Sequence, residues 1–121
     1  MKTLLQQHQD PDLRSYWIWG PYLRTDKEEV ARQNAAKFAP PGSVHYWTPS
    51  PHLAEELSSQ LHLQQGRLAW DVYILYARGV VWGANFPPPT YWQHQLGVIQ
   101  GEPMNVTRLD GKITDALRNR R

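Results

Sequence analysis

The sequence predicts one domain of the α/β class. Short runs rich in aromatic and β-branched residues alternate with segments whose apolar residues recur at helical spacing. That alternation is typical of a sheet covered by helices. The chain has 121 residues, of which 40% are hydrophobic and 20% charged, and this is enough to bury one core without disulfides. We therefore expect a single domain over residues 1–121, with its core at about 12–97 and a C-terminal extension at 98–121.

The first part of the chain predicts two strands, each followed by a helix. After a helical turn at 3–9, the aromatic run at 15–19 is expected to form a strand that ends at a Gly-Pro pair. Thr25 and Glu28 have the spacing of a capping box, which predicts a helix from Thr25 to about residue 38. The Pro-Pro-Gly sequence at 40–42 ends that helix.

A second strand and a second helix follow. Residues 44–47 predict the strand, and Ser50 caps the helix with Pro51 at its first position, where the missing N–H would be unpaired in any case. Leucines at four-residue spacing predict the buried side of this helix; they are Leu53, Leu57 and Leu61.

The last part of the chain predicts a hairpin and a short helix. Residues 70–76 are apolar on both faces after the first two positions, which indicates a central strand. The turn after this run predicts an antiparallel partner strand at 80–82. A short helix is expected at 91–96, an edge strand at 104–109 and a helical turn at 113–117.

This order of elements resembles the thioredoxin-like fold. The resemblance is to uncharacterised bacterial members of that superfamily and covers about residues 12–97. It implies a three-layer arrangement of a sheet with flanking helices, closed by the C-terminal hairpin and short helix. The residues that carry it are Trp19-Gly20-Pro21-Tyr22-Leu23 with Asp26, His45-Tyr46-Trp47, and the run from Trp70 to Tyr76 with Gly79 and Trp82.

Two departures from the family pattern bear on activity. Thioredoxin-like proteins begin with a strand and a CxxC-bearing helix, so the resemblance implies an N-terminally truncated member. They also carry a cis-proline before the hairpin, where this chain has Leu68-Ala69-Trp70. The chain contains no cysteine, which excludes disulfides and thiolate chemistry. No catalytic residue is carried over from the family, and whether the chain is an enzyme of another kind is left open.

Three tryptophans and one carboxylate form the candidate ligand site. In the implied fold, the ends of the strands at 15–19 and 44–47 share a sheet edge with the start of 70–76, which is where α/β sheets bind ligands. A flat or apolar small molecule could bind between these side chains. They are Trp19, Trp47, Trp70 and Asp71.

The alternative for these four residues is a structural role, and we favour it. The tryptophans would fill the space left by the missing helix, because aromatic residues in strands are more often core than pocket. Asp71 would pair with a nearby arginine or cap a backbone group.

Other chemistries lack their sequence patterns. The histidines show no HxH or HExxH spacing, and there is no GxSxG motif or glycine-rich phosphate loop, so no metal or cofactor is predicted. The net charge is only +2 and the basic residues are scattered, apart from Arg118, Arg120 and Arg121, so nucleic acid is not an expected partner. No apolar run reaches the roughly 18 residues of a membrane span, and we expect a cytoplasmic protein without membrane contact.

Two functions remain open. The first is a non-catalytic module that acts by association, with itself or with a protein partner. The second is a small-molecule binding protein, or a cysteine-free enzyme, that uses the tryptophan-lined edge and Asp71. We favour the first, because a sheet without its central strand has unpaired edges and uncovered aromatic surface. This reasoning predicts a homodimer with several tryptophans at or near its interface.

The absence of cysteine predicts that the protein has no thiol–disulfide oxidoreductase activity. In an insulin-reduction assay with dithiothreitol, insulin should precipitate at the rate seen in buffer alone. Acceleration above that rate, with authentic thioredoxin as the positive control, would overturn this expectation.

Overall fold

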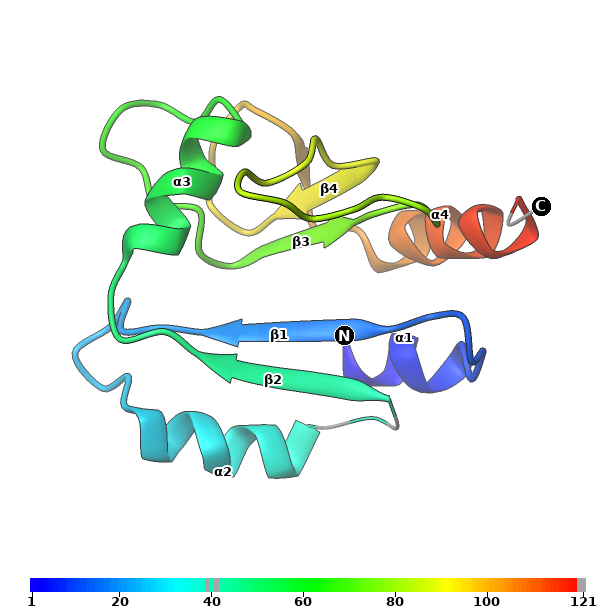
Figure 1. Cartoon of the computed structure of the whole chain (residues 1–121), viewed down its shortest axis with the longest axis horizontal. Coiled ribbons are helices and arrows are strands. Elements are labelled where there is room, and N and C mark those ends of the chain that lie inside the picture. Colours follow the sequence, from blue (N-terminus) through cyan, green and yellow to red (C-terminus); the bar gives the residue numbers. More distant parts are fainter. Residues whose placement is uncertain (39, 41, 120–121) are drawn as a thin grey trace. The chain divides into compact units, whose positions relative to one another are not determined.

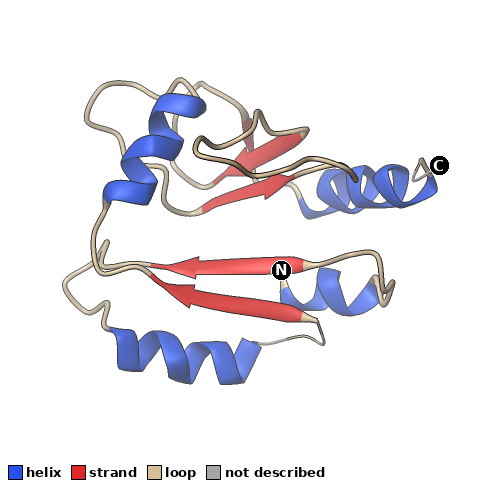
Figure 2. Cartoon of the chain, in the orientation of Figure 1, coloured by secondary structure: helices blue, strands red, loops and turns tan. Residues whose placement is uncertain are grey.

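The computed structural model describes residues 1–38, 40 and 42–119 and confirms a mixed α/β class (Figures 1 and 2). The chain divides into two compact units, Met1–Pro51 and His52–Arg121, called here the N-terminal and C-terminal units. Each unit has its own sheet, of two and three strands respectively. The thioredoxin-like arrangement of these strands stays a prediction. None of the helices among the described residues combines the length and apolar character needed to cross a membrane.

The N-terminal unit is built around one pair of parallel strands. Parallel strands need a crossover connection, which is usually helical, and the helix between these two strands lies alongside the second of them (Figure 1). In the register, Ser15 lies opposite Ser43 and Trp19 opposite Trp47. Side chains alternate between half-buried and exposed along both strands. The elements are α1 (Lys2–Gln7), β1 (Ser15–Trp19), α2 (Glu28–Phe38) and β2 (Ser43–Trp47).

The predicted capping box at Thr25 is wrong. Helix α2 begins three residues later, at Glu28, and the first intrahelical bond runs from the Ala31 N–H to the Lys27 carbonyl at 2.9 Å. The Asp26 carboxylate accepts a hydrogen bond from the Leu23 N–H at 2.6 Å. The segment before Glu28 is therefore held as a turn by a side chain, and this competes with an earlier helix start.

Some expectations fall on residues that the structure does not describe. The predicted helix stop includes Pro41, and the basic tail includes Arg120 and Arg121; all three lie outside the described residues. The side chain of Phe38, at the end of α2, also lies outside the description.

The C-terminal unit contains a three-stranded sheet and the helices α3 and α4. Strand β4 is central: it pairs antiparallel with β3 and parallel with β5. Figure 2 shows the strands of this unit in red and its helices in blue. The elements are α3 (His52–Gln60), β3 (Val72–Leu75), β4 (Tyr91–His94), β5 (Glu102–Pro103) and α4 (Val106–Arg118).

The predicted leucine stripe forms the core of the C-terminal unit. Leu57 and Leu61 are buried together with Ala69. Leu53, the first leucine of the stripe, is half-buried and packs against this cluster. Other half-buried side chains from β3, β4 and the loops complete the cluster; they are Leu63, Val72, Ile74, Phe86 and Trp92.

Two predictions about the hairpin are wrong. Residues 80–82 are not a strand, and the segment expected to be a helix at 91–96 instead contains β4, the antiparallel partner of β3. The long loop at 77–90 closes where the Thr90 N–H donates to the Leu75 carbonyl at 3.0 Å and the Ala77 N–H donates to Thr90 Oγ1 at 2.9 Å. Strand pairing on both sides of β4 outweighs the local helix signal, because it satisfies the backbone and buries the side chains at once.

The predicted edge strand at 104–109 is also wrong in its position. The strand is β5, at Glu102–Pro103, and helix α4 begins at Val106. Asn105 caps this helix, because its side-chain oxygen accepts a hydrogen bond from the Arg108 N–H at 2.9 Å. The predicted helical turn at 113–117 is the second half of α4.

Truncation of the central core leucine tests this packing. Leu57 is only 6% exposed, so Leu57→Ala should lower the free energy of unfolding by about 2–5 kcal/mol, as buried leucine truncations do. Urea denaturation followed by circular dichroism measures the loss. The matched control is Ser59→Ala, at an exposed position of the same helix, which should change stability by less than about 0.5 kcal/mol. A loss that small for Leu57→Ala would contradict the core described here.

Candidate functional site

Trp19 belongs to a stack of three rings on one face of the β1–β2 sheet. Trp17 and Trp19 lie two residues apart on β1 and share a face, and His45 lies opposite Trp17 on β2. The ring centroids of Trp17 and His45 are 5.4 Å apart, and each of these rings is 6.1 Å from that of Trp19. The planes are close to parallel, which is a favourable offset arrangement for aromatic rings.

A hydrogen bond determines the protonation state of His45 in this stack. The Trp19 indole N–H donates to His45 Nδ1 at 3.0 Å. An indole nitrogen can only donate, so Nδ1 carries no proton and the proton of the neutral ring is on Nε2. Burial lowers the pKa of His45 below its ordinary value of 6.5. Nε2 is enclosed and has no hydrogen-bond partner among the described residues.

Trp47 lies on the same face of the sheet as this stack. It follows His45 by two positions on β2, stands opposite Trp19 in the register and is half-buried. The N-terminal unit thus brings together two of the four predicted site residues, Trp19 and Trp47, at the ends of paired strands. Trp19 uses its one polar atom within the unit, as a packed side chain does.

Asp71 precedes β3 in the C-terminal unit and has local partners. Its carboxylate accepts a hydrogen bond from the Tyr73 hydroxyl at 3.1 Å. The Gln95 side-chain amide, with its nitrogen toward Asp71, donates to Oδ2 at 3.0 Å and to Oδ1 at 3.3 Å. The Asp71 carbonyl also accepts from the Gln95 backbone N–H at 3.1 Å. These contacts replace the arginine or backbone-capping partner that the sequence suggested, and they join the start of β3 to the end of β4.

The backbone of Asp71 is in the left-handed region, with φ of 55°. Aspartate tolerates this conformation better than most residues, because its short side chain can hydrogen-bond nearby. Trp70, the neighbouring predicted residue, is 38% exposed. Strand β3 therefore begins after a left-handed residue, Asp71, whose side chain bonds Tyr73 and Gln95. Trp70, just before it, lies partly at the surface.

Tyr73 is held in its protonated form beside Asp71. Burial, the charge of Asp71 and the hydrogen bond to that carboxylate together raise the pKa of Tyr73 to about 12. At neutral pH the Tyr73 hydroxyl stays protonated and donates a hydrogen bond to the Asp71 carboxylate. The pair is consequently a structural contact and not a proton-transfer pair poised near pH 7.

The four predicted site residues form two pairs. Trp19 and Trp47 lie in the N-terminal unit, and Trp70 and Asp71 lie in the C-terminal unit. The site that combines all four stays a prediction. Within each unit the polar atoms of Trp19 and Asp71 are engaged by neighbouring side chains.

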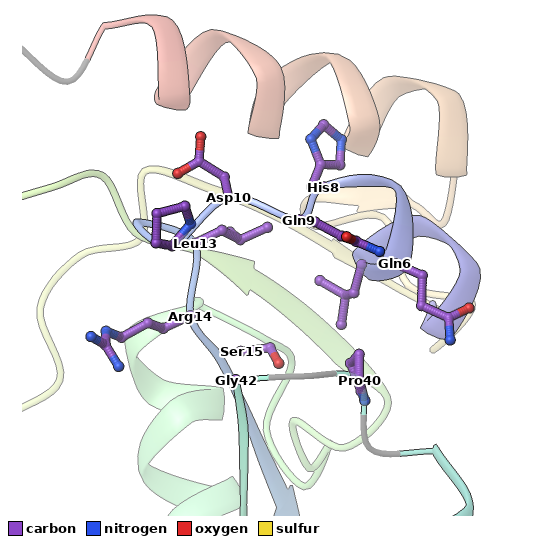
Figure 3. Close-up of a pocket in the computed structure, with 11 residues that line it drawn as sticks. Gln6, His8, Gln9, Asp10, Leu13, Arg14, Ser15, Pro40 and Gly42 are labelled. Atoms are coloured by element: carbon purple, nitrogen blue, oxygen red, sulfur yellow. The ribbon is translucent and has the colours of Figure 1, made fainter.

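A pocket of about 370 Å³ lies elsewhere, in the N-terminal unit (Figure 3). It is lined by the end of α1, the loop before β1 and the segment before β2, and none of the four predicted residues lines it. Figure 3 shows Arg14 directed away from His8. The Asp10 carboxylate accepts the Asp12 N–H at 2.9 Å and so holds the loop in a turn.

Sequence reasoning missed a buried polar network in the C-terminal unit. Gln93 is fully buried, and its amide nitrogen donates to the Tyr91 hydroxyl at 2.7 Å and to the Asn105 carbonyl at 3.1 Å. Its amide oxygen accepts the Asn105 N–H at 3.1 Å. Gln93 therefore links β4 to the N-terminus of α4. Nothing near Gln93 in the sequence signals this, because the partner at 105 arrives only through tertiary folding.

The network continues to the protein surface through a carboxylate. The Tyr91 hydroxyl donates to Glu102 Oε2 at 2.6 Å, and Arg108 Nη1 lies 3.0 Å from the same oxygen. Hydrogen bonds from Tyr91 and Arg108 lower the pKa of Glu102. Burial, followed by the hydrogen bond to Glu102, raises the pKa of Tyr91. Each group has a partner, so the arrangement stabilises the junction of β4, β5 and α4.

Histidine and carboxylate groups meet on α3 without forming a metal centre. His52 lies 3.6 Å from Glu55 and 3.4 Å from Glu56, and all three side chains are exposed. Among the residues that the structure describes, no group of three or more histidine, aspartate or glutamate side chains is placed to hold a metal ion.

The chain matches no family model, no curated protein and no solved structure. The thioredoxin-like resemblance therefore stays a prediction that rests on the residues quoted for it, and the candidate sites rest on their own geometry.

The ring stack predicts a pH dependence of stability that depends on His45. The folded-state pKa lies below 6.5, so the unfolded state takes up the proton first. The stabilisation that neutral His45 gives to the folded state is fully present at pH values above the pKa of His45 in the unfolded chain. It is lost as the pH falls through the pKa of His45 in the folded state. Thermal unfolding of the wild type should show a steeper loss between about pH 7.5 and pH 5 than that of His45→Phe. Parallel pH profiles for the two proteins would contradict the assignment.

Proposed function

We propose that this chain is a non-catalytic, thioredoxin-like module that works by association, and that its partner is a second copy of itself. One observation carries the proposal. Strands β1 and β3 are both apolar, and each has one edge without a strand partner among the described residues. In the fold that the sequence resembles, the corresponding edges pair with a further strand.

An open edge on an apolar strand favours association. The outward N–H and C=O groups of such a strand cost about 1–3 kcal/mol each when they are buried without a partner. Another strand that pairs with the edge removes this cost, and exposed edges are the usual templates for such pairing. Strands β1 and β3 contain neither lysine nor proline, which are the residues that commonly block an edge.

The exposed face of the β1–β2 sheet supports the same conclusion. Parallel sheets are normally covered on both faces, yet Tyr16 is 61% and Tyr46 is 55% exposed, with Ile18 and Val44 also exposed between them. None of these four side chains is charged, so a second copy can approach without repulsion between like charges. A face of this kind is typical of an interaction surface.

Exposed aromatic and apolar residues in the C-terminal unit fit an interface with tryptophans nearby. Trp70 and Trp82 are both partly exposed, and Val81, beside Trp82, is 82% exposed. Tryptophan is enriched at interfaces because it buries a large area while its N–H remains able to hydrogen-bond. These positions are the basis for placing tryptophans at or near the dimer contact.

The alternative function, binding of a small apolar or aromatic molecule, has less support. It needs polar groups that are available to orient a ligand. The indole N–H of Trp19 and the carboxylate of Asp71 already have partners within their own units. We therefore place association first and keep the small-molecule binder, or a cysteine-free enzyme, as the second candidate.

Sedimentation equilibrium at micromolar concentration tests the proposal. We expect a species of twice the 14.1 kDa monomer mass. The dimer should persist when salt is raised from about 0.1 to about 1 M, because screening weakens charge contacts and not apolar or backbone ones. A single species at the monomer mass would contradict self-association. Dissociation by salt would contradict its apolar basis.

A further inference from the structure

We infer that two copies of the chain join through β3, with the two β3 strands as antiparallel neighbours in a register centred on Tyr73. This inference rests on the proposed self-association and names the surface that carries it. Its basis is the sheet order β3-β4-β5, in which β3 has a strand partner on one side only among the described residues.

The pairing of β3 with β4 determines which backbone groups face the open edge. Val72 lies opposite His94, and the Gln95 N–H donates to the Asp71 carbonyl at 3.1 Å, just outside that pair. In an antiparallel ladder, bonds on either side of a residue pair mean that the pair itself exchanges none. The N–H and C=O of Val72, and of Ile74 two residues later, therefore point away from β4.

The two edges of this sheet differ in how well they resist pairing. The β5 edge is two residues long and contains Pro103, which has no N–H to donate. Strand β3 is four residues long and contains no proline and no charged side chain; its residues are Val72, Tyr73, Ile74 and Leu75. Short length, proline and charge are the features that protect edges, so the edge open to pairing is that of β3.

Two-fold symmetry then selects one register. If one residue of the first copy faces a given residue of the second, the reverse pair also forms, so each copy gives and receives the same bonds. When Val72 of one copy faces Ile74 of the other, every outward N–H and C=O of both strands has a partner, and the two Tyr73 residues face each other on the axis. Registers centred on Val72 or on Ile74 leave outward groups of the other residue unpaired.

The side chains are compatible with this register. Val72 and Ile74 pack against the core, so the opposite face of the strand carries Tyr73 and Leu75. The Asp71 side chain lies on that face too, because it accepts the Tyr73 hydroxyl. Asp71 of one copy lies opposite Leu75 of the other, so the carboxylates of the two copies do not meet. The two tyrosines form an aromatic cross-strand pair, which stabilises antiparallel strands. This self-complementarity without like-charge contact points to a second copy as the occupant of the edge.

Cysteine cross-linking tests the register on a background that contains no cysteine. Facing residues of a pair that exchanges no bonds have Cα atoms about 4.5 Å apart, and disulfides form at about 4.4–6.8 Å. Tyr73→Cys should therefore give a covalent dimer on mild oxidation, seen by non-reducing gel electrophoresis. The matched control is Leu75→Cys, on the same strand and face. Its two copies would lie about 13 Å apart along the strand, so cross-linking should be at least about tenfold slower.

A second arm leaves Tyr73 intact, in case its replacement disturbs folding. Asp71→Cys and Leu75→Cys proteins should each cross-link slowly alone and rapidly when mixed, because residues 71 and 75 face each other only between copies. Rapid cross-linking of Leu75→Cys alone would overturn the register. A wild-type dimer by sedimentation, without cross-linking of Tyr73→Cys or of the mixture, would overturn the β3 contact and leave the proposed function standing. A monomeric wild type would overturn both.

Discussion

Backbone pairing along β4 holds the C-terminal unit together. Among the strands that the structure describes, β4 alone has a neighbour on each side, so its ladder joins β3 to β5. The side chains of Gln93 and His94 are fully buried there, and burying a polar group without a hydrogen bond costs free energy. Gln93 avoids that cost through Tyr91 and Asn105, and in doing so positions the start of α4. The sheet, its polar network and the C-terminal helix thus depend on the same strand.

The N-terminal unit depends on packing between aromatic rings and on one hydrogen bond within that packing. Its two parallel strands cover one face with Trp17, Trp19, His45 and Trp47. A hydrogen bond from the Trp19 indole N–H to His45 Nδ1 joins the two strands on that face. The opposite face keeps its apolar side chains at the surface, although a parallel sheet is normally covered on both faces. His45 Nε2 is enclosed without a hydrogen-bond partner among the described residues, and the apolar side chains of the opposite face stay exposed.

The two units differ in which of their groups have partners and which are open to association. The carboxylate of Asp71, a polar group of the kind that functional sites use, has its partners within the unit. Among the described residues, β1 and β3 each have one edge without a strand partner, and β1 also carries the exposed, uncharged side chains of Tyr16 and Ile18. Groups of that kind give affinity for another strand or another apolar surface. This distribution supports the proposed association.

The sequence by itself determined the α/β class, strands β1 and β2, and the buried side of α3, because alternating and four-residue apolar patterns are local signals. Tertiary structure alone decided that residues 91–94 form a strand and that the chain makes two sheets. Thr90 followed by Tyr91 carries a local helix signal, but pairing with β3 and β5 satisfies the backbone of β4 and buries its side chains. Asp71 and Gln93 each bond a tyrosine two residues away, but their other partners, Gln95 and Asn105, are distant in sequence, so no local pattern reveals them.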